Sequence, residues 1–457
     1  MIKNPDYNLI IIGGGSAAFA AAIQAAELGK TAVMVEQSTM GGTCVNIGCV
    51  PSKFLIHRSS LAEPGNWPSD MAALVDGMRG KKYKEVLDSY SDSVSWISGR
   101  AEIIDSKTIQ LEDGKVITGD ALLIAAGSHT VLPDIPGAEG IEILDSEALL
   151  ALPSPPESLI ILGGRFVALE LGQAFSRLGS KVTILQRSDR LIPNHEPEVS
   201  ENIREELEGG GIEVVTGVSL KSIEENGNEK TVVFTQNSSE SRRSGTAILS
   251  ALGRRGNSEG LNLPALGIEL DSSGRIVTNS SRQAGNSGIY AAGDIVASPS
   301  LVYVAAKEGK TAAKNALNAG NNAWKETISL DIVPEVIFTS PQVAKVGLTE
   351  AEAGARGINV EKSVFPYSET PNAGVNEVTA GVIVLIRDAE SHKLLGGDIV
   401  APNAGDMIQT LTIAIEAGWT SERLQDVLFP YLTGVEGLKL ASITFAKDVS
   451  KLSCCAV

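Results

Sequence analysis

The stretch NLIIIGGGSAAFA, residues 8–20, decides the fold of this 457-residue chain. Residues 9–12 form a short apolar run, which is typical of a strand buried in a parallel sheet. The glycines at 13–15 follow at once and open an alanine-rich helix that is expected to run to about Leu28. A second strand is expected at residues 31–36. Together these elements make a β-α-β unit, the building block of a doubly wound α/β sheet.

The turn carries the residues that a dinucleotide-binding unit needs. Gly13 permits the tight turn, Gly15 lets the backbone approach a pyrophosphate, and Ala18 allows close packing of helix on strand. The helix N-terminus then faces the phosphates. Glu36 ends the second strand at the distance expected for a carboxylate that binds a ribose hydroxyl. We therefore predict a dinucleotide site here; the alternative is a glycine turn without a ligand.

A similar unit recurs at residues 159–186. Gly163 matches the first glycine of the motif, but Arg165 stands where the second glycine is expected. Arg165 opposes close approach of the backbone to a ligand, although its charge could meet a pyrophosphate. Arg187 and Arg190 follow the second strand of this unit, where an acid would repel a 2′-phosphate and an arginine would bind it. The pattern favours NADPH over NADH; the alternative is that these arginines are merely solvated.

Composition narrows the class of protein. The chain is 43% hydrophobic, has 47 glycines and carries a net charge of −17. The glycine content suits an α/β protein of several domains, and the acidic surface disfavours nucleic acid or an anionic membrane as a partner. Residues 1–7 do not resemble a signal peptide, and no stretch approaches the ~20 apolar residues of a membrane helix. The default location is therefore the cytoplasm.

The four cysteines form two close pairs, Cys44/Cys49 and Cys454/Cys455. A secreted scaffold would scatter its cysteines, so tight pairs indicate redox or soft-metal chemistry. In GGTCVNIGCVPSK, residues 41–53, one helical turn could bring the sulfurs of Cys44 and Cys49 together. A helix beginning near Cys49 would favour its thiolate. The alternative is a structural disulfide or two inert buried thiols.

This segment resembles the redox-active disulfide of the flavoprotein disulfide reductases, the FAD-dependent pyridine nucleotide-disulfide oxidoreductase family. The resemblance implies that Cys44 is the outer interchange thiol and that Cys49 is the inner thiol, which contacts the flavin and forms a charge-transfer complex. It also implies that Lys53, near the flavin, pairs with Glu170 from the second nucleotide-binding unit. The other residues assigned to cofactors are Gly42, Thr43, Gly127, Asp294 and Val302 for FAD, and Gly163, Arg187 and Arg190 for NADPH. Phe166 falls where related enzymes often place an aromatic lid over the flavin.

The resemblance also implies the domain plan. The expected fold class is α/β, with two doubly wound, Rossmann-like dinucleotide-binding domains and a C-terminal α+β dimerisation domain. The NADPH-binding domain interrupts the FAD-binding domain. The expected boundaries are 1–150 for the first part of the FAD-binding domain, 151–275 for the NAD(P)H-binding domain, 276–330 for the second FAD-binding part, and 331–457 for the dimerisation domain.

The C-terminal segment departs from the thiol-disulfide reductases of this family. Those enzymes carry a His-Pro pair with a glutamate five residues after the histidine, and here Glu436 matches the glutamate while Tyr431 occupies the histidine position. The chain's four histidines all lie elsewhere in the sequence. A tyrosine has a pKa of about 10 and is a poor proton shuttle at neutral pH. A disulfide substrate is therefore less plausible.

The chain ends in KLSCCAV, residues 451–457. Two adjacent thiols can chelate a soft, thiophilic ion, but they do not fill a zinc tetrahedron. Together with Tyr431 and Glu436, the Ser-Cys-Cys ending resembles the mercuric reductases, a branch of the same family. The resemblance implies a homodimer in which Tyr431, Cys454 and Cys455 of one subunit complete the site of the other. The alternative is that the two final cysteines are an accidental pair.

The same resemblance implies a substrate and a route. Hg(II) arrives as a thiolate complex, is captured by Cys454 and Cys455, passes to Cys44 and Cys49, and is reduced to Hg(0). All four cysteines then act as metal ligands in turn. The main alternative is a high-molecular-weight thioredoxin reductase, which predicts a histidine where Tyr431 stands. A flavin-bearing protein without turnover would have little use for two intact dithiol pairs.

Overall fold

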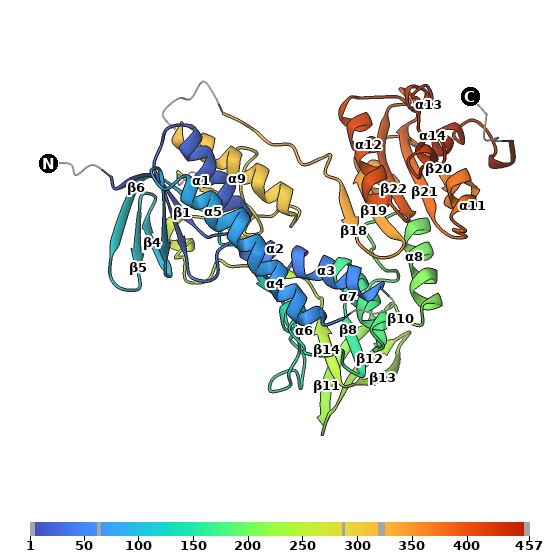
Figure 1. Cartoon of the computed structure of the whole chain (residues 1–457), viewed down its shortest axis with the longest axis horizontal. Coiled ribbons are helices and arrows are strands. Elements are labelled where there is room, and N and C mark those ends of the chain that lie inside the picture. The colour runs from blue at the N-terminus through green and yellow to red at the C-terminus, as the bar shows by residue number, and fades with distance from the viewer. Residues whose placement is uncertain (1–4, 62–64, 286–287, 319–324, 452–457) are drawn as a thin grey trace.

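The computed structural model describes residues 5–61, 65–285, 288–318 and 325–451. Figure 1 shows three lobes: an N-terminal lobe that the chain leaves and later re-enters, a middle lobe, and a C-terminal lobe built from the last part of the chain. This order matches the predicted plan of an interrupted first domain. The boundaries at 150, 275 and 330 stay predictions. No helix in the described ranges is both long enough and apolar enough to cross a bilayer.

The N-terminal lobe is built on a sheet with the strand order β16-β17-β6-β1-β2-β3. The predicted first unit is present as β1 (Tyr7–Ile12), α1 (Ser16–Glu27) and β2 (Ala32–Glu36). Strand β17, which follows the middle lobe in sequence, pairs in parallel with β6, so both parts of the chain share one core. The other elements are α2 (Gly42–Asn46), α3 (Cys49–Ser59), α4 (Trp67–Arg79), η1 (Gly80–Lys84), α5 (Glu85–Ser89), β3 (Val94–Ser98), β4 (Ala101–Asp105), β5 (Thr108–Leu111), β6 (Val116–Ile124), β7 (Ser128–Thr130), β15 (Arg254–Gly256), η2 (Pro264–Leu266), β16 (Gln283–Ala284), β17 (Ile289–Ala291) and α9 (Val302–Leu317).

Small residues fix the start of helix α1. Helices α1 and α9 lie side by side against the sheet (Figure 1). A Cβ on Gly309 would lie 2.1 Å from the carbonyl oxygen of Ala17, so glycine allows this close approach of the two helices. Gly13 has a φ of +123°, and a Cβ there would lie 2.2 Å from the carbonyl oxygen of Ala125. Only glycine suits that position, because both the backbone conformation and the space exclude a side chain.

The middle lobe repeats the plan with a parallel sheet of order β10-β9-β8-β14 and an added antiparallel sheet, β11-β12-β13. Residues 227–245, with their many polar side chains, are expected to form a solvated hairpin, and β12 and β13 do form one. The hairpin is not fully solvated, because Val232 and Phe234 of β12 are buried. The elements are α6 (Ser146–Leu150), β8 (Ser158–Leu162), α7 (Phe166–Arg177), β9 (Lys181–Leu185), α8 (Pro197–Gly209), β10 (Glu213–Val215), β11 (Ser219–Asn226), β12 (Glu229–Gln236), β13 (Ser239–Gly245) and β14 (Ala247–Ser250).

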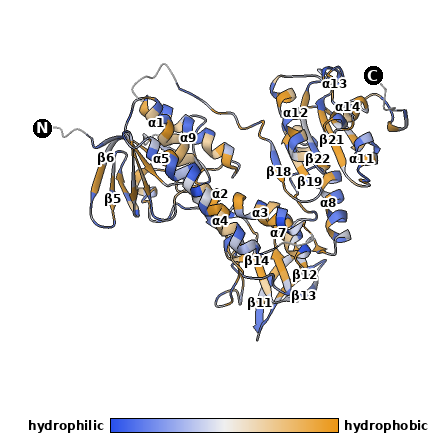
Figure 2. Cartoon of the chain, viewed as in Figure 1, coloured by the Kyte–Doolittle hydropathy of each residue, from blue (hydrophilic) through white to orange (hydrophobic). Residues whose placement is uncertain are grey.

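The C-terminal lobe is a five-stranded antiparallel sheet of order β18-β19-β22-β21-β20 with helices packed on it, which confirms the predicted α+β class. Figure 2 shows mostly hydrophobic colour on the buried strand β21 and hydrophilic colour on β11 of the middle lobe. The elements are β18 (Glu335–Ile337), β19 (Gln342–Gly347), α10 (Glu350–Ala355), β20 (Val360–Pro366), η3 (Tyr367–Glu369), α11 (Pro371–Val375), β21 (Val382–Asp388), β22 (Leu394–Ala401), α12 (Ala404–Glu416), α13 (Ser421–Gln425), α14 (Glu436–Ile443) and η4 (Val449–Lys451).

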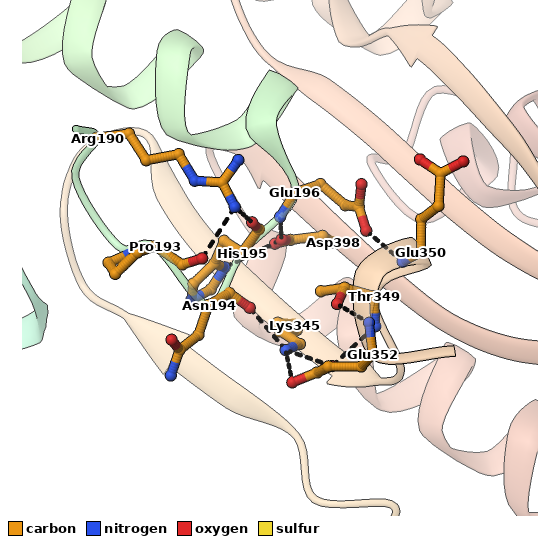
Figure 3. A network of polar contacts seen from close by, with 10 residues as sticks. All are labelled: Arg190, Pro193, Asn194, His195, Glu196, Lys345, Thr349, Glu350, Glu352 and Asp398. Carbon is orange, nitrogen blue, oxygen red and sulfur yellow. Dashed lines mark hydrogen bonds and ion pairs between the residues drawn. The ribbon is translucent and has the colours of Figure 1, made fainter. Parts of the chain in front are cut away.

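A buried polar network joins the middle lobe to the C-terminal lobe (Figure 3). Nδ1 of His195 lies 2.9 Å from Oδ1 of Asp398, and both side chains are only 2% exposed. The backbone N–H of Glu196 donates to the same carboxylate at 2.8 Å. Lys345 of β19 donates to the carbonyl oxygen of Asn194 at 2.8 Å. Because these groups are withdrawn from water, each depends on its partner across the junction, which fixes the loop before α8 against the C-terminal sheet.

Candidate active site

The cysteines of the N-terminal lobe face each other from two short helices. Cys44 lies in α2, and Cys49 is the first residue of α3. The expectation that one helical turn joins them is wrong, because α2 ends before Gly48. A Cβ on Gly48 would lie 2.9 Å from the carbonyl oxygen of Thr43, so glycine lets α3 begin directly against α2. Both thiols are free, and they lie within hydrogen-bonding contact.

The two thiols differ in acidity. A hydrogen bond from Cys44 lowers the pKa of Cys49 to about 7, and the positive charge of Lys53 acts in the same direction. The same hydrogen bond, together with burial, raises the pKa of Cys44. Near neutral pH the pair therefore consists of a thiolate at the N-terminus of α3 and a thiol beside it. Because the thiolate is the nucleophile and the soft-metal ligand, Cys49 is the reactive member of this pair.

The predicted pair of Lys53 and Glu170 is present in the structure. Nζ of Lys53 lies 2.7 Å from Oε2 of Glu170, whose side chain is 5% exposed. The other carboxylate oxygen of Glu170 accepts a hydrogen bond from the backbone N–H of Phe338 at 2.9 Å. The Lys53 ammonium also lies 5.0 Å from the centroid of the Phe338 ring. Residues of all three lobes therefore hold this cation one turn of α3 beyond Cys49.

Two clefts flank the β1–α1 turn. The N-terminus of α1 has no side-chain cap, so its first backbone N–H groups can bind a phosphate. A carboxylate (Glu36) on one side, an uncapped helix in the middle and two thiols on the other side fit an extended flavin dinucleotide. Lining residues of the first cleft include Gly13, Glu36, Gly99, Arg100, His129 and Asn257. Those of the second include Gly15, Ser16, Thr43, Cys44, Cys49, Gly127, Asp294 and Val302.

Not every residue assigned to FAD lines these clefts. Ala18 is fully buried inside the lobe and serves packing. Gly42 has a φ of +62°, and a Cβ there would lie 2.7 Å from Cα of Gly15. Gly42 therefore brings the cysteine segment against the turn. Lys53 is also not among the described residues that line the two clefts.

A buried glutamate holds the turn that presents Asp294. Glu308 of α9 is fully buried and accepts hydrogen bonds from the backbone N–H of Gly293 at 2.7 Å and from Arg282 at 2.8 Å. Ser128 donates to Asp294 at 3.1 Å. The sequence reasoning missed Glu308. The available signal was an acid in a helix that is otherwise rich in alanine.

The cleft at the β8–α7 turn has a volume of about 570 Å³. Gly163 and Arg187 line it as predicted, and Arg165, Phe166 and Arg254 line it as well. No aspartate or glutamate is among the described residues that line it. Helix α7 also begins without a side-chain cap. A cationic cleft at an uncapped helix N-terminus fits the phosphates of a dinucleotide.

Arg190 does not join this cleft. Its Nη2 donates to the carbonyl oxygens of Pro193 at 2.9 Å and His195 at 3.2 Å (Figure 3). The guanidinium is turned toward these carbonyls because the loop folds toward the C-terminal lobe, where His195 meets Asp398. The predicted role in 2′-phosphate binding is therefore withdrawn for Arg190 and kept for Arg187.

Tyr83 lies beside the cysteine pair and was missed from the sequence. Its ring packs edge-on against Phe19, with 4.9 Å between the centroids. Burial raises the pKa of Tyr83, and the neighbouring Cys44 raises it further. Its hydroxyl is hydrogen-bonded to Ser16, which lines the cleft that holds the cysteines. No sequence motif marks Tyr83, because the packing of η1 against α1 brings it to this site.

The C-terminal candidates lie in a different part of the molecule. The Tyr431 side chain is 57% exposed. Glu436 is the first residue of α14, and its Oε2 is buried without a hydrogen-bond partner among the described residues. In Figure 1, α14 is well separated from α2 and α3. Cys454 and Cys455 lie outside the described residues.

A dithiol beside one dinucleotide cleft, with a second cleft in the next lobe, defines the class of a flavoprotein disulfide reductase. Residues 7–309 match the family described as pyridine nucleotide-disulphide oxidoreductase, and residues 333–442 match its dimerisation domain. The chain belongs to this family, which confirms the resemblance in the cysteine segment. The cofactors of the family are FAD and a pyridine nucleotide, and the dimerisation domain indicates a homodimer.

Within this family, the chain is similar over nearly its whole length to mercuric reductases. It is 43% identical to that of Staphylococcus aureus, with 99% of this chain and 85% of the relative covered. It is 39% identical to that of Streptomyces lividans, with 98% of each covered. Among solved structures it is similar to the Cu(II) complex of the HOCl-induced flavoprotein disulfide reductase RclA of Escherichia coli, with a TM-score of 0.87, 27% identity, and 97% of this chain and 100% of that chain covered.

Proposed function

We propose that this chain is a mercury(II) reductase that uses NADPH and bound FAD to convert thiol-bound Hg(II) to Hg(0), and so detoxifies mercury. The observation that carries the proposal is the Cys44/Cys49 pair, in which a thiolate and a thiol in contact line one cleft. Tyr431 at the histidine position disfavours a disulfide substrate. The similarity to mercuric reductases along both chains supports the substrate.

The residues around the Cys44/Cys49 pair make its two sulfurs available as soft metal ligands. When bound, FAD supplies two electrons that it takes from NADPH as hydride. Glu170 holds Lys53, and the Lys53 cation favours the Cys49 thiolate. Cys44 gives up its proton when its sulfur binds the metal, because the thiolate is the metal ligand. The dithiolate then suits a thiophilic ion such as Hg(II).

The substrate reaches this pair by ligand exchange. In a complex of Hg(II) with two small thiolates, the sulfurs of Cys44 and Cys49 form two new Hg–S bonds. The two original Hg–S bonds break, one small thiolate takes up the proton that Cys44 gives up, and both small ligands leave. Two electrons then reduce Hg(II) to Hg(0), and both protein sulfurs return as thiolates. The product is uncharged and leaves the site.

Cys454 and Cys455 are proposed as the first ligands of the incoming complex. On this route the two small thiolates leave at the tail, and the Hg–S bonds that break when Cys44 and Cys49 bind are those to the tail sulfurs. In one chain α14 lies far from α3 (Figure 1), so we propose that the tail of one subunit serves the cysteine pair of the second copy. Tyr431, which is exposed, would then lie over that pair and position the ion during transfer. Such successive dithiol pairs hand the ion from sulfur to sulfur, so that it is never free.

The decisive experiment measures NADPH oxidation by the purified protein with different acceptors. Hg(II) with excess small thiol should support turnover, whereas oxidised glutathione, lipoamide and oxidised thioredoxin should not. Cold-vapour detection of Hg(0) identifies the product. Turnover with a disulfide acceptor and none with Hg(II) would reject the proposal in favour of a thioredoxin reductase-like enzyme.

The tail is tested separately. The double variant Cys454→Ala/Cys455→Ala should lose turnover with Hg(II) held by two thiolates, but keep turnover with Hg(II) held by weak halide ligands. Flavin reduction by NADPH is the control and should stay normal. Unchanged kinetics with thiol-bound Hg(II) would exclude the tail as a relay while leaving the cysteine pair of α2 and α3 in its role.

A further inference from the structure

The second dinucleotide turn contains an arginine at the place where the first turn has a glycine. Arg165 precedes α7 with φ −115° and ψ −163°, and Gly15 precedes α1 with φ −91° and ψ −169°. Both positions are extended backbone that any residue can adopt, so the arginine causes no backbone strain. The tight turn itself is preserved, because Gly163 has a φ of +120° and a Cβ there would lie 2.4 Å from the carbonyl oxygen of Ala251.

The β1–α1 and β8–α7 turns differ in the space that is open in front of them. A Cβ on Gly15 would already lie 3.7 Å from Cα of Gly42, which belongs to the cysteine segment. No segment of the described part of the chain covers Arg165 in this way, and its exposed side chain lines the cleft at the β8–α7 turn. The second turn therefore has room for a long side chain within reach of a bound dinucleotide.

Charge gives that side chain a role. The lining of this cleft contains Arg165, Arg187 and Arg254 and no described acidic residue, on a chain with a net charge of −17. Arg254 donates to the backbone oxygen of Ser128 at 2.6 Å and is already engaged. Within the described ranges, neither Arg165 nor Arg187 forms an ion pair or a hydrogen bond with its side chain. Two unpaired guanidinium groups at one cleft in an acidic protein favour an anionic ligand.

We propose that the Arg165 guanidinium binds the pyrophosphate of the nicotinamide dinucleotide at the N-terminus of α7, an inference that rests on the proposed use of NADPH. The helix N-terminus is where phosphate oxygens bind, and Arg165 is its first flanking residue. Arg187 follows the end of β9, at the position that reads the ribose. Arg165 therefore strengthens the binding of NADPH and NADH alike, whereas Arg187 discriminates between them.

The test measures dissociation constants of NADP⁺ and NAD⁺ for the FAD-loaded protein by titration calorimetry, without mercury. In Arg165→Gly, the motif's usual residue is restored, so the turn should fold, and thermal unfolding checks this. The dissociation constants of both dinucleotides should rise by the same factor, about tenfold, or about 1.4 kcal/mol. The matched variant Arg187→Ala should raise only that of NADP⁺. Raising the salt concentration should shrink the Arg165→Gly effect.

Three results would overturn the inference. Unchanged or tighter binding in Arg165→Gly would mean that the side chain is idle or obstructs the ligand. A loss confined to NADP⁺ would assign Arg165 to the 2′-phosphate. If the unaltered protein binds neither dinucleotide, the proposed function fails together with this inference, which separates that failure from a failure of Arg165 alone.

Discussion

The two strand-turn-helix units of this chain have the same local geometry but different surroundings. Gly13 and Gly163 have φ values of +123° and +120°, and each packs against the end of a neighbouring strand. The β1–α1 turn is covered by the chain's own cysteine segment, and the backbone N–H of Gly41 donates to the carbonyl oxygen of Gly14 at 2.8 Å. The β8–α7 turn opens instead onto a cleft lined by arginines.

This difference shows how one local motif can serve two purposes. A turn that is covered by a fixed segment suits a cofactor that stays bound next to the residues of that segment. A turn that opens onto a cationic cleft suits a ligand that arrives and leaves. The surroundings, rather than the glycine motif, therefore assign the two sites. The following changes test each half of this contrast.

The largest effect is expected when the cysteine segment, residues 41–53, keeps its backbone shape but loses its reactive sulfur. Cys49→Ser should lower Hg(II) turnover by about a thousandfold or more, because the ion then lacks one of the two ligands of this pair, and the lost ligand is the member of the pair that is a thiolate near neutral pH. The long-wavelength charge-transfer absorption after anaerobic reduction by NADPH should also vanish. Cys44→Ser is the matched control: it should lose turnover but keep the band, and a band that survives in Cys49→Ser would contradict the assignment.

A smaller effect is expected when the contact between the segment and the turn is forced apart. Gly42→Ala places a Cβ 2.7 Å from Cα of Gly15, whereas Gly114→Ala, at a φ of +84° in the same lobe, meets nothing within 4 Å. Both variants carry a backbone strain of about 1 kcal/mol, but only Gly42→Ala adds a clash of about 1–3 kcal/mol. Gly42→Ala should therefore unfold earlier on heating and retain less FAD. Equal losses in both variants would show that the contact does not matter.

At the open turn, the two arginines predicted from the sequence should behave differently. Arg187→Ala should raise the KM for NADPH by about tenfold and leave that for NADH unchanged, since only NADPH carries the 2′-phosphate. Arg190→Ala should change neither value, because its guanidinium already binds two backbone carbonyl oxygens. A selective loss of NADPH in Arg190→Ala would reverse the correction made from the structure.

The sequence was sufficient to predict those elements that depend on local residue patterns. The apolar run of β1 and its glycine turn, and the same signals at β8, are sufficient to predict both β-α-β units, because buried parallel strands and tight turns demand those residues nearby. The break before α3 and the direction of Arg190 depend on contacts distant in sequence. Gly48 must clear Thr43, and the Arg190 loop follows the pairing of His195 with the C-terminal sheet.

Tyr83 and Glu308 show the same limit at the site. Neither stands in a recognisable motif. Tyr83 reaches the cysteines only because η1 packs on α1, and Glu308 reaches Gly293 only because α9 crosses the same sheet. The pair of Lys53 and Glu170 was predicted because the family resemblance supplied the partner. Spacing alone would not have linked two residues in different lobes.

The smallest effect is expected from removing the charge of Lys53, which lowers the pKa of Cys49 in the cysteine segment. The thiolate of Cys49 forms as the pH rises through its pKa of about 7, so iodoacetamide should alkylate it with a midpoint near that pH, while the raised pKa of Cys44 keeps the second thiol protonated. Lys53→Gln removes a cation that lowers this pKa and leaves the carboxylate of Glu170 nearby. The loss of the cation and the remaining negative charge of Glu170 both disfavour the Cys49 thiolate, so the midpoint of alkylation should rise by about one pH unit. Arg58→Gln is the matched control on α3, because Arg58 pairs with Asp70 at 2.5 Å and should leave the midpoint in place. If the midpoint stays near 7 in Lys53→Gln, the hydrogen bond from Cys44 sets the acidity of Cys49 without the lysine. The cysteine segment then acts through its own sulfurs alone.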